Sequence, residues 1–520
     1  MKIITILLAF VMATLLYGGP SKTTVTRLIS PDDYKLLDYM EWKEILGDVP
    51  YCGIGKIAQI SGRGGKVNLI INTDLYFKLY NYLNPDSGQF VEDIIGDGYS
   101  VSVDTMSMSS DPFAPDSLRN YLANEGCIGA ILIGDLPIPW FQMMEVFYGW
   151  TPHYTTFPID LFYMDIDGVW EDNYTHIGGN MIAGSDSIYD THSGSLDPDI
   201  FIGRLAASPV GNDSALISAY FNRNHEYRNG DMNLFGDTAL LYVDDDWAGS
   251  TNYWKSSLSA IYDSIYCVSD NETTIASDYK NRIKMNYEWI SLFAHSWPGG
   301  HTFKYNNGNN YSDYYSYEII TNNPPAKFYN LFCCSNARYT ESDYCAGMYI
   351  FNTSTGLEAM GSTKTGSMLE FQYYYDRLAI GECFGDAFRY WFEIMAEAWG
   401  DTSRSWFYGM TLIGDPTLVM KDTLSGIVSK KREQQEKFQI VIKQKTNQGI
   451  IFHISGSSIT RSSINIYNLA GREIYGINFE GETVEWCYKN RNGSKIPNGT
   501  YLYKVISGNQ VGSGKFNIIR

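Results

Sequence analysis

The run FYNLFCC, at residues 328–334, is apolar almost throughout and ends on two adjacent cysteines. A second run of this kind, WISLFAH at residues 289–295, ends on a histidine. Further short apolar runs occupy residues 66–72, 127–135, 199–205, 238–246 and 356–363. Strands that are covered on both faces carry apolar residues nearly throughout, so these runs predict buried strands of a parallel sheet.

Helix-like segments lie between these runs. Residues 212–230, for example, begin with Asn-Asp-Ser and end with Gly, which are typical start and stop signals of a helix. The alternation of strands and helices indicates an α/β fold in which helices connect parallel strands. Such sheets bind their ligands at the carboxyl ends of the strands, where both His295 and Cys334 are expected to lie.

Composition limits the class of protein. The chain has 520 residues, which predicts more than one domain, and a net charge of −19, which argues against general nucleic-acid binding. Its eight cysteines include no repeated Cys-x-x-Cys, so neither a zinc ribbon nor a disulfide-rich scaffold is indicated. Adjacent cysteines such as Cys333 and Cys334 rarely form a disulfide with each other.

The first residues have the pattern of a signal peptide. Lys2 precedes an apolar run at residues 3–16, and small residues follow, so we predict a signal peptide over residues 1–19. The run is short for a transmembrane helix, and the alternative is a buried N-terminal strand or helix. The expected location is therefore secreted or at the cell surface, and residues 20–62 form an N-terminal segment or a short propeptide.

The charge balance changes near residue 429. From there to the end, the chain carries 14 Lys or Arg and 6 Asp or Glu. We predict a first, larger domain over residues 63–425, a linker over residues 426–437 and a second domain over residues 438–520. In the last part, short runs with partial alternation are separated by Gly, Asn and Pro, which predicts a small all-β sandwich of the Ig-like kind.

The pair of Cys334 and His295 suggests nucleophilic catalysis, because a thiolate needs a neighbour that handles protons. The Gly/Pro-rich loop after His295 could direct backbone N–H groups at an oxyanion. Other interpretations stay open: a buried cysteine is usually an inert small hydrophobe, and a histidine at a strand end is usually structural. A zinc site with His295, His301 and a carboxylate is disfavoured, because the intervening Pro and Gly residues fix no common face.

Six motifs in the correct order resemble the gingipain family of cysteine peptidases, in the caspase-like clan. They are AILIGDLPIP (130–139), PIDLFYMDIDGVWEDN (158–173), DPDIFIGRLAAS (197–208), LFAHSWPGGH (292–301), LFCCSNARY (331–339) and TLIGDPTLVM (411–420). The resemblance covers roughly residues 60–420. It implies a parallel-sheet caspase/gingipain-like domain in two sub-domains, and a secreted endopeptidase that hydrolyses peptide bonds through a thioester.

The resemblance also assigns roles. Cys334 stands at the family's nucleophile, Cys333 at the small residue before it, His295 at the catalytic histidine, and Asp199 at an acidic residue that orients the histidine. The backbone N–H groups of Ser296 and Cys334 are the implied oxyanion donors. The family usually has Gly where this chain has Ser296, so the alternative is an inactive homologue that serves as a surface binding or adhesion protein. Specificity for the residue before the cleaved bond cannot be read from the sequence.

No cofactor is required for this chemistry. A segment with spaced carboxylates, Asp165, Asp167 and Asp172, partly matches a calcium loop, and gingipain relatives bind calcium. The twelve-residue calcium pattern is incomplete, so a structural calcium site and a solvated acidic turn both remain open.

The C-terminal part resembles the sorting domains of type IX secretion cargo. The matching residues are Asn468, Gly471, Trp486, Gly493, Pro497, Gly499, Tyr501 and Tyr503, with Cys487 where an acidic residue is usual. The resemblance implies recognition by outer-membrane secretion machinery, in addition to a protein or peptide substrate for the first domain. The alternative is a plain Ig-like accessory domain.

Overall fold

The computed structural model divides into two compact units, Met1–Met420 and Lys421–Arg520, and each is described by itself. It describes residues 34–147, 151–177, 180–232, 238–396, 400–420, 439–445, 449–455, 462–468, 472–479, 481, 483–491, 493–507 and 510–518. The predicted signal peptide and the predicted linker at residues 426–437 lie outside these ranges.

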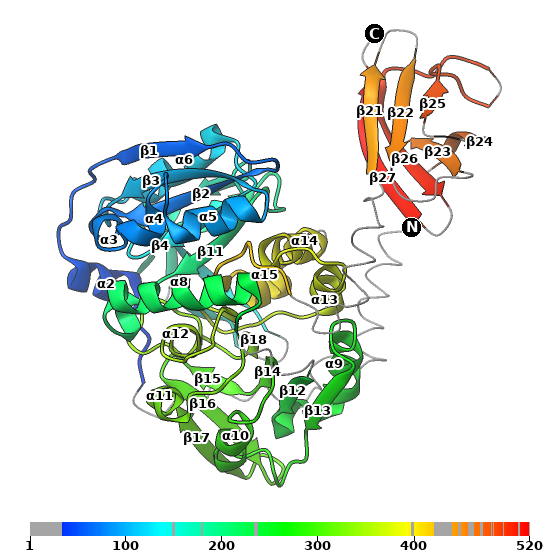
Figure 1. The fold of residues 1–520 in the computed structure, drawn as a ribbon. Coiled ribbons are helices and arrows are strands. Elements are labelled where there is room, and N and C mark those ends of the chain that lie inside the picture. Colours follow the sequence, from blue (N-terminus) through cyan, green and yellow to red (C-terminus); the bar gives the residue numbers. More distant parts are fainter. Residues whose placement is uncertain are drawn as a thin grey trace. The chain divides into compact units, whose positions relative to one another are not determined.

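An 11-stranded sheet forms the centre of the larger unit (Figure 1). From one edge to the other its strands are β1 (Ile54–Ile60), β3 (Ser100–Met106), β2 (Lys66–Asn72), β4 (Gly129–Ile133), β11 (Phe201–Leu205), β20 (Met410–Gly414), β19 (Glu358–Ser362), β18 (Phe328–Phe332), β14 (Trp289–Phe293), β12 (Thr238–Val243) and β13 (Ser264–Val268). Each of the seven predicted apolar runs contains one of these strands. The α/β class with a mostly parallel sheet is therefore confirmed.

The sheet has two halves that run in opposite directions. Strands β3, β2, β4, β11 and β20 are mutually parallel, and so are β19, β18, β14, β12 and β13. The halves meet at the antiparallel pair β19–β20, and β1 adds an antiparallel edge. The sequence predicted two sub-domains in this unit. The change of strand direction divides the sheet into two halves, but by its internal contacts the unit forms one compact body.

Helices pack against this sheet. Helix α8 (Asp213–Asn229) matches the predicted segment: the Asn212 side chain accepts the Ala215 N–H at 3.0 Å, and Gly230 ends the helix with φ of 77°. The other helices are α2 (Tyr39–Leu46), α3 (Thr73–Lys78), α4 (Tyr80–Leu83), α5 (Gln89–Gly96), α6 (Ala114–Glu125), α7 (Leu161–Met164), α9 (Thr251–Leu258), α10 (Ala276–Arg282), α11 (Tyr317–Asn322), α12 (Cys345–Phe351), α13 (Gln372–Ala379), α14 (Phe384–Ala396) and α15 (Asp401–Phe407), with 3₁₀ helices η1 (Ser208–Val210) and η2 (Asp245–Ser250). Across the described ranges, none of them combines the length and apolar character that a membrane crossing requires.

Small sheets lie outside the main sheet. They comprise β5 (Trp140–Glu145) with β6 (His153–Pro158), β7 (Val169–Glu171) with β10 (Thr191–Ser193), β8 (Tyr174–Ile177) with β9 (Asn180–Ala183), and β15 (His295–Trp297), β16 (Gly300–Tyr305) and β17 (Asn310–Tyr315). The last sheet follows β14 after a single residue, Ala294, so it carries the chain directly away from the carboxyl end of that strand.

The smaller unit consists of antiparallel strands in two sheets. One contains β21 (Gln439–Lys445), β22 (Ile450–Ser455) and β25 (Thr483–Trp486), and the other contains β24 (Glu473–Phe479), β23 (Ser462–Asn468), β26 (Gly499–Ser507) and β27 (Gln510–Ile518). Apolar residues from both sheets, Trp486 and Val505 among them, share one hydrophobic cluster. The unit is therefore an all-β domain, and its Ig-like and sorting assignments stay predictions.

Candidate active site

Two reactive side chains follow neighbouring strands of the main sheet. Strands β14 and β18 pair in parallel, with Phe293 opposite Phe332, and His295 and Cys334 each come two residues later. Both residues line the same small cavity. The structure therefore brings together the two side chains that the sequence predicted as a pair.

The adjacent cysteines have different surroundings. Cys333 is buried, and its Sγ lies 3.6 Å from the carbonyl oxygen of Leu292 on the neighbouring strand. Cys334 is partly exposed and faces the cavity. The next residue, Ser335, has φ of 54° and donates its N–H to the Lys364 carbonyl at 2.9 Å, so the chain turns sharply just after Cys334. This geometry makes Cys333 a packing residue and leaves Cys334 accessible.

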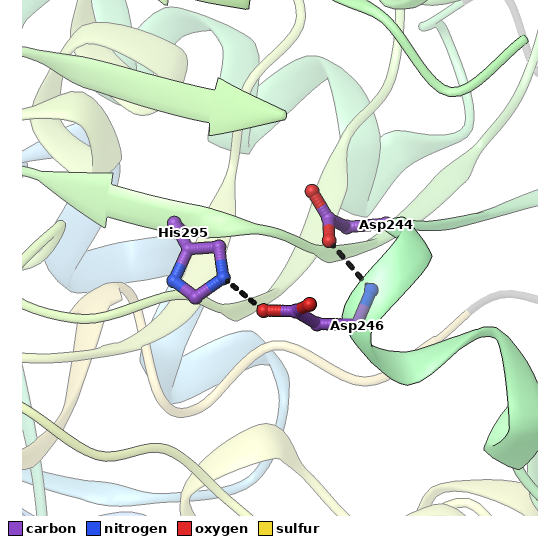
Figure 2. A group of neighbouring side chains, drawn as sticks. All are labelled: Asp244, Asp246 and His295. Atoms are coloured by element: carbon purple, nitrogen blue, oxygen red, sulfur yellow. Dashed lines mark hydrogen bonds and ion pairs between the residues drawn. The ribbon is translucent and has the colours of Figure 1, made fainter. Parts of the chain in front are cut away.

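His295 is held by a carboxylate that follows another neighbouring strand. Its Nε2 lies 2.8 Å from Oδ2 of Asp246, in η2 just after β12 (Figure 2). The Lys304 ammonium lies 2.6 Å from the same oxygen. Asp244 supports this arrangement, because its carboxylate accepts the Asp246 N–H at 2.9 Å and the Lys304 N–H at 2.5 Å. Two segments, residues 244–246 and Lys304 of β16, thus fix the orientation of the imidazole.

The surroundings favour a neutral thiol and a neutral imidazole at rest. Burial lowers the pKa of His295, and this outweighs the upward effect of Asp246. Burial raises the pKa of Cys334, although the Gly366 N–H and the Lys364 charge act in the opposite direction. For Asp246, burial raises the pKa, but the hydrogen bonds of His295 and Lys304 outweigh it, so the net shift is downward.

These shifts fix the tautomer of His295. Because Asp246 is ionised and only accepts hydrogen bonds, the proton of the neutral imidazole lies on Nε2. The unprotonated nitrogen is then Nδ1, which makes no hydrogen bond with the described residues and can take the proton of the thiol. The arrangement can therefore carry out general base catalysis with a cysteine nucleophile.

Asp199 lies elsewhere. Its carboxylate accepts the N–H groups of Ile166 and Asp167, at 2.9 and 3.1 Å, and no hydrogen bond joins it to His295 among the described residues. The position that was predicted for Asp199 is occupied by Asp246. A signal was present in the sequence, since the apolar run at residues 238–246 ends in three aspartates at the carboxyl end of a strand.

Ser296 replaces the usual glycine without backbone strain. It lies in strand β15 opposite His301, and its φ is not in the left-handed region. Its hydroxyl donates to the Gly300 carbonyl at 2.8 Å, which braces the turn of the β15–β16 hairpin. Serine has the same backbone N–H donor as glycine, and the conformation at residue 296 does not require glycine. Ser296 can therefore fill the backbone role of glycine here.

The carboxylates beside His295 do not form a convincing metal site. Ligand atoms of Asp244, Asp246 and His295 lie within 4.8 Å of one another (Figure 2). However, the Lys304 ammonium already binds Asp246, and it would repel a divalent cation. His301, the second histidine of the zinc hypothesis, instead contacts the Ser296 hydroxyl and the Tyr349 hydroxyl, at 3.2 Å each.

The predicted calcium residues are brought together only in part. Asp165 and Asp167 group with Asp199, within 4.8 Å, while Asp172 binds the Ser185 hydroxyl and two backbone N–H groups. Both oxygens of Asp165 are engaged, by the Gly168 N–H at 2.7 Å and by His192 Nε2. Each Asp165 oxygen keeps a further lone pair, so these contacts do not decide on an ion, and the structural calcium stays a prediction.

Comparisons with known proteins point to one family. The model of the family described as Peptidase family C25 matches residues 96–421. No curated protein matches the chain. Among solved structures, PorZ, a surface component of the type-IX secretion system of Porphyromonas gingivalis, is 18% identical over 22% of this chain and 14% of its own, with a TM-score of 0.14. A β-glucosidase from Listeria innocua in complex with laminaribiose is 10% identical over 59% of this chain and 50% of its own, with a TM-score of 0.16. The chain spans half or less of these two structures, and such scores carry no argument about the fold.

Proposed function

Since the chain belongs to peptidase family C25, whose model matches more than half of its residues, we propose that it is an active thiol endopeptidase with Cys334 as the nucleophile and His295 as the base. The observation that carries this proposal is the placement of both side chains after paired strands and around one cavity. Protein or peptide substrates follow from the family.

The proposed reaction has two steps. His295 takes the Cys334 proton at Nδ1 while the sulfur attacks the scissile carbonyl, and the imidazolium then protonates the leaving amine. Water, activated by the same imidazole, hydrolyses the thioester. Asp246 acts as a positioning residue in place of Asp199, because its ionised carboxylate holds the imidazole and stabilises its charged form. The N–H groups of Ser296 and Cys334 are the proposed oxyanion donors.

We also propose export through the signal peptide at residues 1–19, and recognition of the C-terminal unit by outer-membrane secretion machinery. Support comes from the sequence pattern of the first residues and from the compact all-β fold of the second unit. The alternative for the whole protein is an inactive homologue that binds at the cell surface, motivated by Ser296.

Alkylation and peptide cleavage separate these alternatives. A peptide chloromethyl ketone should modify Cys334 selectively, because this substrate-like probe binds beside His295, and the purified protein should cleave a mixed peptide library when cleavage is read by mass spectrometry. Cys334→Ala and His295→Ala should abolish cleavage, while Cys333→Ala, the matched control, should retain it. Equal labelling of all accessible cysteines without cleavage would favour the binding protein. Activity that survives Cys334→Ala but not a chelator would favour a zinc hydrolase.

A further inference from the structure

The cavity beside Cys334 has a distinctive lining. Apart from His295 and Cys334, its walls include four aromatic side chains and two hydroxyl side chains, which are Phe147, Trp247, Phe332, Trp406, Thr365 and Ser367. No acidic side chain lines it among the residues that the structure describes. Any substrate group that enters this cavity therefore meets aromatic rings and hydroxyls.

Besides Asp246, which precedes the lining residue Trp247 and is bound by His295 and Lys304, the charge nearest to this cavity in sequence is positive. Lys364 precedes the lining residue Thr365, and its fully buried ammonium forms an ion pair with Glu145 and donates to the carbonyls of Thr365 and Ser405. Glu145 is also paired with His153, whose Nε2 lies 2.6 Å from the second carboxylate oxygen. The Glu145 charge is thus already neutralised, so a cationic substrate group would find no free carboxylate there.

The cavity is also small. Its volume is about 20 Å³, close to the room that one water molecule needs. The rings of Phe147 and Trp406 meet edge to face at 5.3 Å and form one wall. The Val146 N–H donates to the Ser405 hydroxyl at 2.8 Å, which ties the segment after β5 to helix α15. This link holds the two rings in place against a large side chain.

We propose that this cavity receives the substrate side chain just before the scissile bond, and that it selects small uncharged residues such as Gly, Ala and Ser over Arg, Lys and large aromatic residues. The inference rests on the proposed peptidase function. Size excludes the large residues, and the absence of a free counter-charge in the lining excludes the basic ones.

A peptide series that varies only the residue before the cleaved bond tests this inference on the full-length protein. We expect kcat/KM for Ala to exceed that for Phe by at least about tenfold, and that for Arg or Lys by about 100-fold. Preferred cleavage after Arg, Lys or Phe would overturn the inference and leave the peptidase function intact. If no peptide is cleaved and Cys334 is not selectively alkylated, the proposed function fails instead, and the inference falls with it.

Two substitutions test the walls separately. Phe147→Ala should raise the kcat/KM ratio of Leu over Ala peptides by about tenfold, because the cavity gains volume. Phe113→Ala is the matched control, since that ring is 71% exposed outside the cavity lining, and it should leave the ratio unchanged. An unchanged ratio in a folded Phe147→Ala protein would contradict the assignment of this wall.

The charge is tested by Lys364→Met, which removes the ammonium partner of Glu145 and leaves His153 as its remaining partner. We expect the kcat/KM ratio of Arg over Ala peptides to rise by at least about tenfold, and the double variant Lys364→Met, Glu145→Gln to reverse this rise. A rise that persists in the double variant would argue against the charge mechanism. If the single variant does not fold, the wild-type peptide series still decides whether basic residues are excluded.

Discussion

At the scale of single residues, the carboxylate that hydrogen-bonds to His295 is not the one that the sequence predicted. Asp199 was assigned from a motif, whereas Asp246 hydrogen-bonds to His295. Both follow the same rule that functional groups lie at strand ends, but only the spatial order of strands decides which carboxylate meets the histidine. That order places β12 directly beside β14, although 45 residues separate the end of β12 from the start of β14 in sequence. A motif match along the chain does not contain this information.

Asp246→Asn should lower kcat/KM by about 100-fold or more, by analogy with the orienting aspartate of serine proteases. The amide can donate to Nε2, which would shift the imidazole proton to Nδ1 and remove the base. Steady-state cleavage of the best peptide measures this loss. Asp199→Asn is the matched control and should stay close to wild type. An equal loss in both variants, with unchanged thermal unfolding, would return Asp199 to the site.

The pH profile of kcat/KM should show an acid limb below the ordinary histidine range. Burial lowers the pKa of His295, so the neutral base persists as the pH falls past about 6.5 and is lost only at lower pH. In the same way, burial raises the pKa of Cys334, so alkylation without substrate should accelerate with pH beyond the range of an ordinary thiol. The account is contradicted if the acid limb lies above pH 6.5 and the alkylation profile of His295→Ala shows that this limb belongs to His295.

At the scale of elements, the sequence predicted the main strands well because their residues are buried on both faces. Residues 66–72 were predicted as a strand and form β2 with the same bounds. The run at residues 289–295 ends earlier than predicted, since the strand stops at Phe293 and the chain begins a separate hairpin at His295. Apolar runs do not reveal such changes of direction, which depend on hydrogen bonds with β16 and β17.

The same hairpin determines the surroundings of His301, the second histidine of the disfavoured zinc site. The turn at residues 298–299 places His301 opposite Ser296, inside the protein, where it contacts Ser296 and Tyr349. Burial lowers its pKa to about 3. His301 is therefore a neutral structural residue of this hairpin and does not share a metal site with His295.

His301 should make stability depend on pH. Its folded pKa lies below the unfolded value of about 6.5, so the unfolded chain binds the proton more tightly, and stability is lost as the pH falls from about 6.5 toward 3. The loss is about 1.4 kcal/mol per pH unit in this window, or about 5 kcal/mol in total. Urea unfolding at several pH values measures it, and His301→Gln should flatten the slope by this amount. An unchanged slope would show that His301 is not buried as described.

At the scale of the whole molecule, two hydrophobic clusters share no residue. One spans residues from Val67 to Leu418, and the other lies between Ile450 and Ile518. The shift in charge near residue 429 predicts a domain boundary in that region, because separate domains often differ in composition, and the exact boundary stays a prediction. The packing within each cluster could not be predicted in this way, since it depends on which strands pair.

Separate cores predict separate unfolding. Trp486 is buried in the smaller cluster, and its indole N–H donates to the Lys489 carbonyl at 2.8 Å. Trp486→Ala should destabilise this unit by about 3–5 kcal/mol, through the lost apolar contact and the cavity that remains. Calorimetry of the full chain should then show one transition shifted to lower temperature and one unchanged, with cleavage by the peptidase unit unaffected. Trp391→Ala, a matched change in the larger cluster, should move the other transition instead. If either substitution shifts both transitions together, the two units unfold as one cooperative body, and the peptidase depends for its stability on the C-terminal unit.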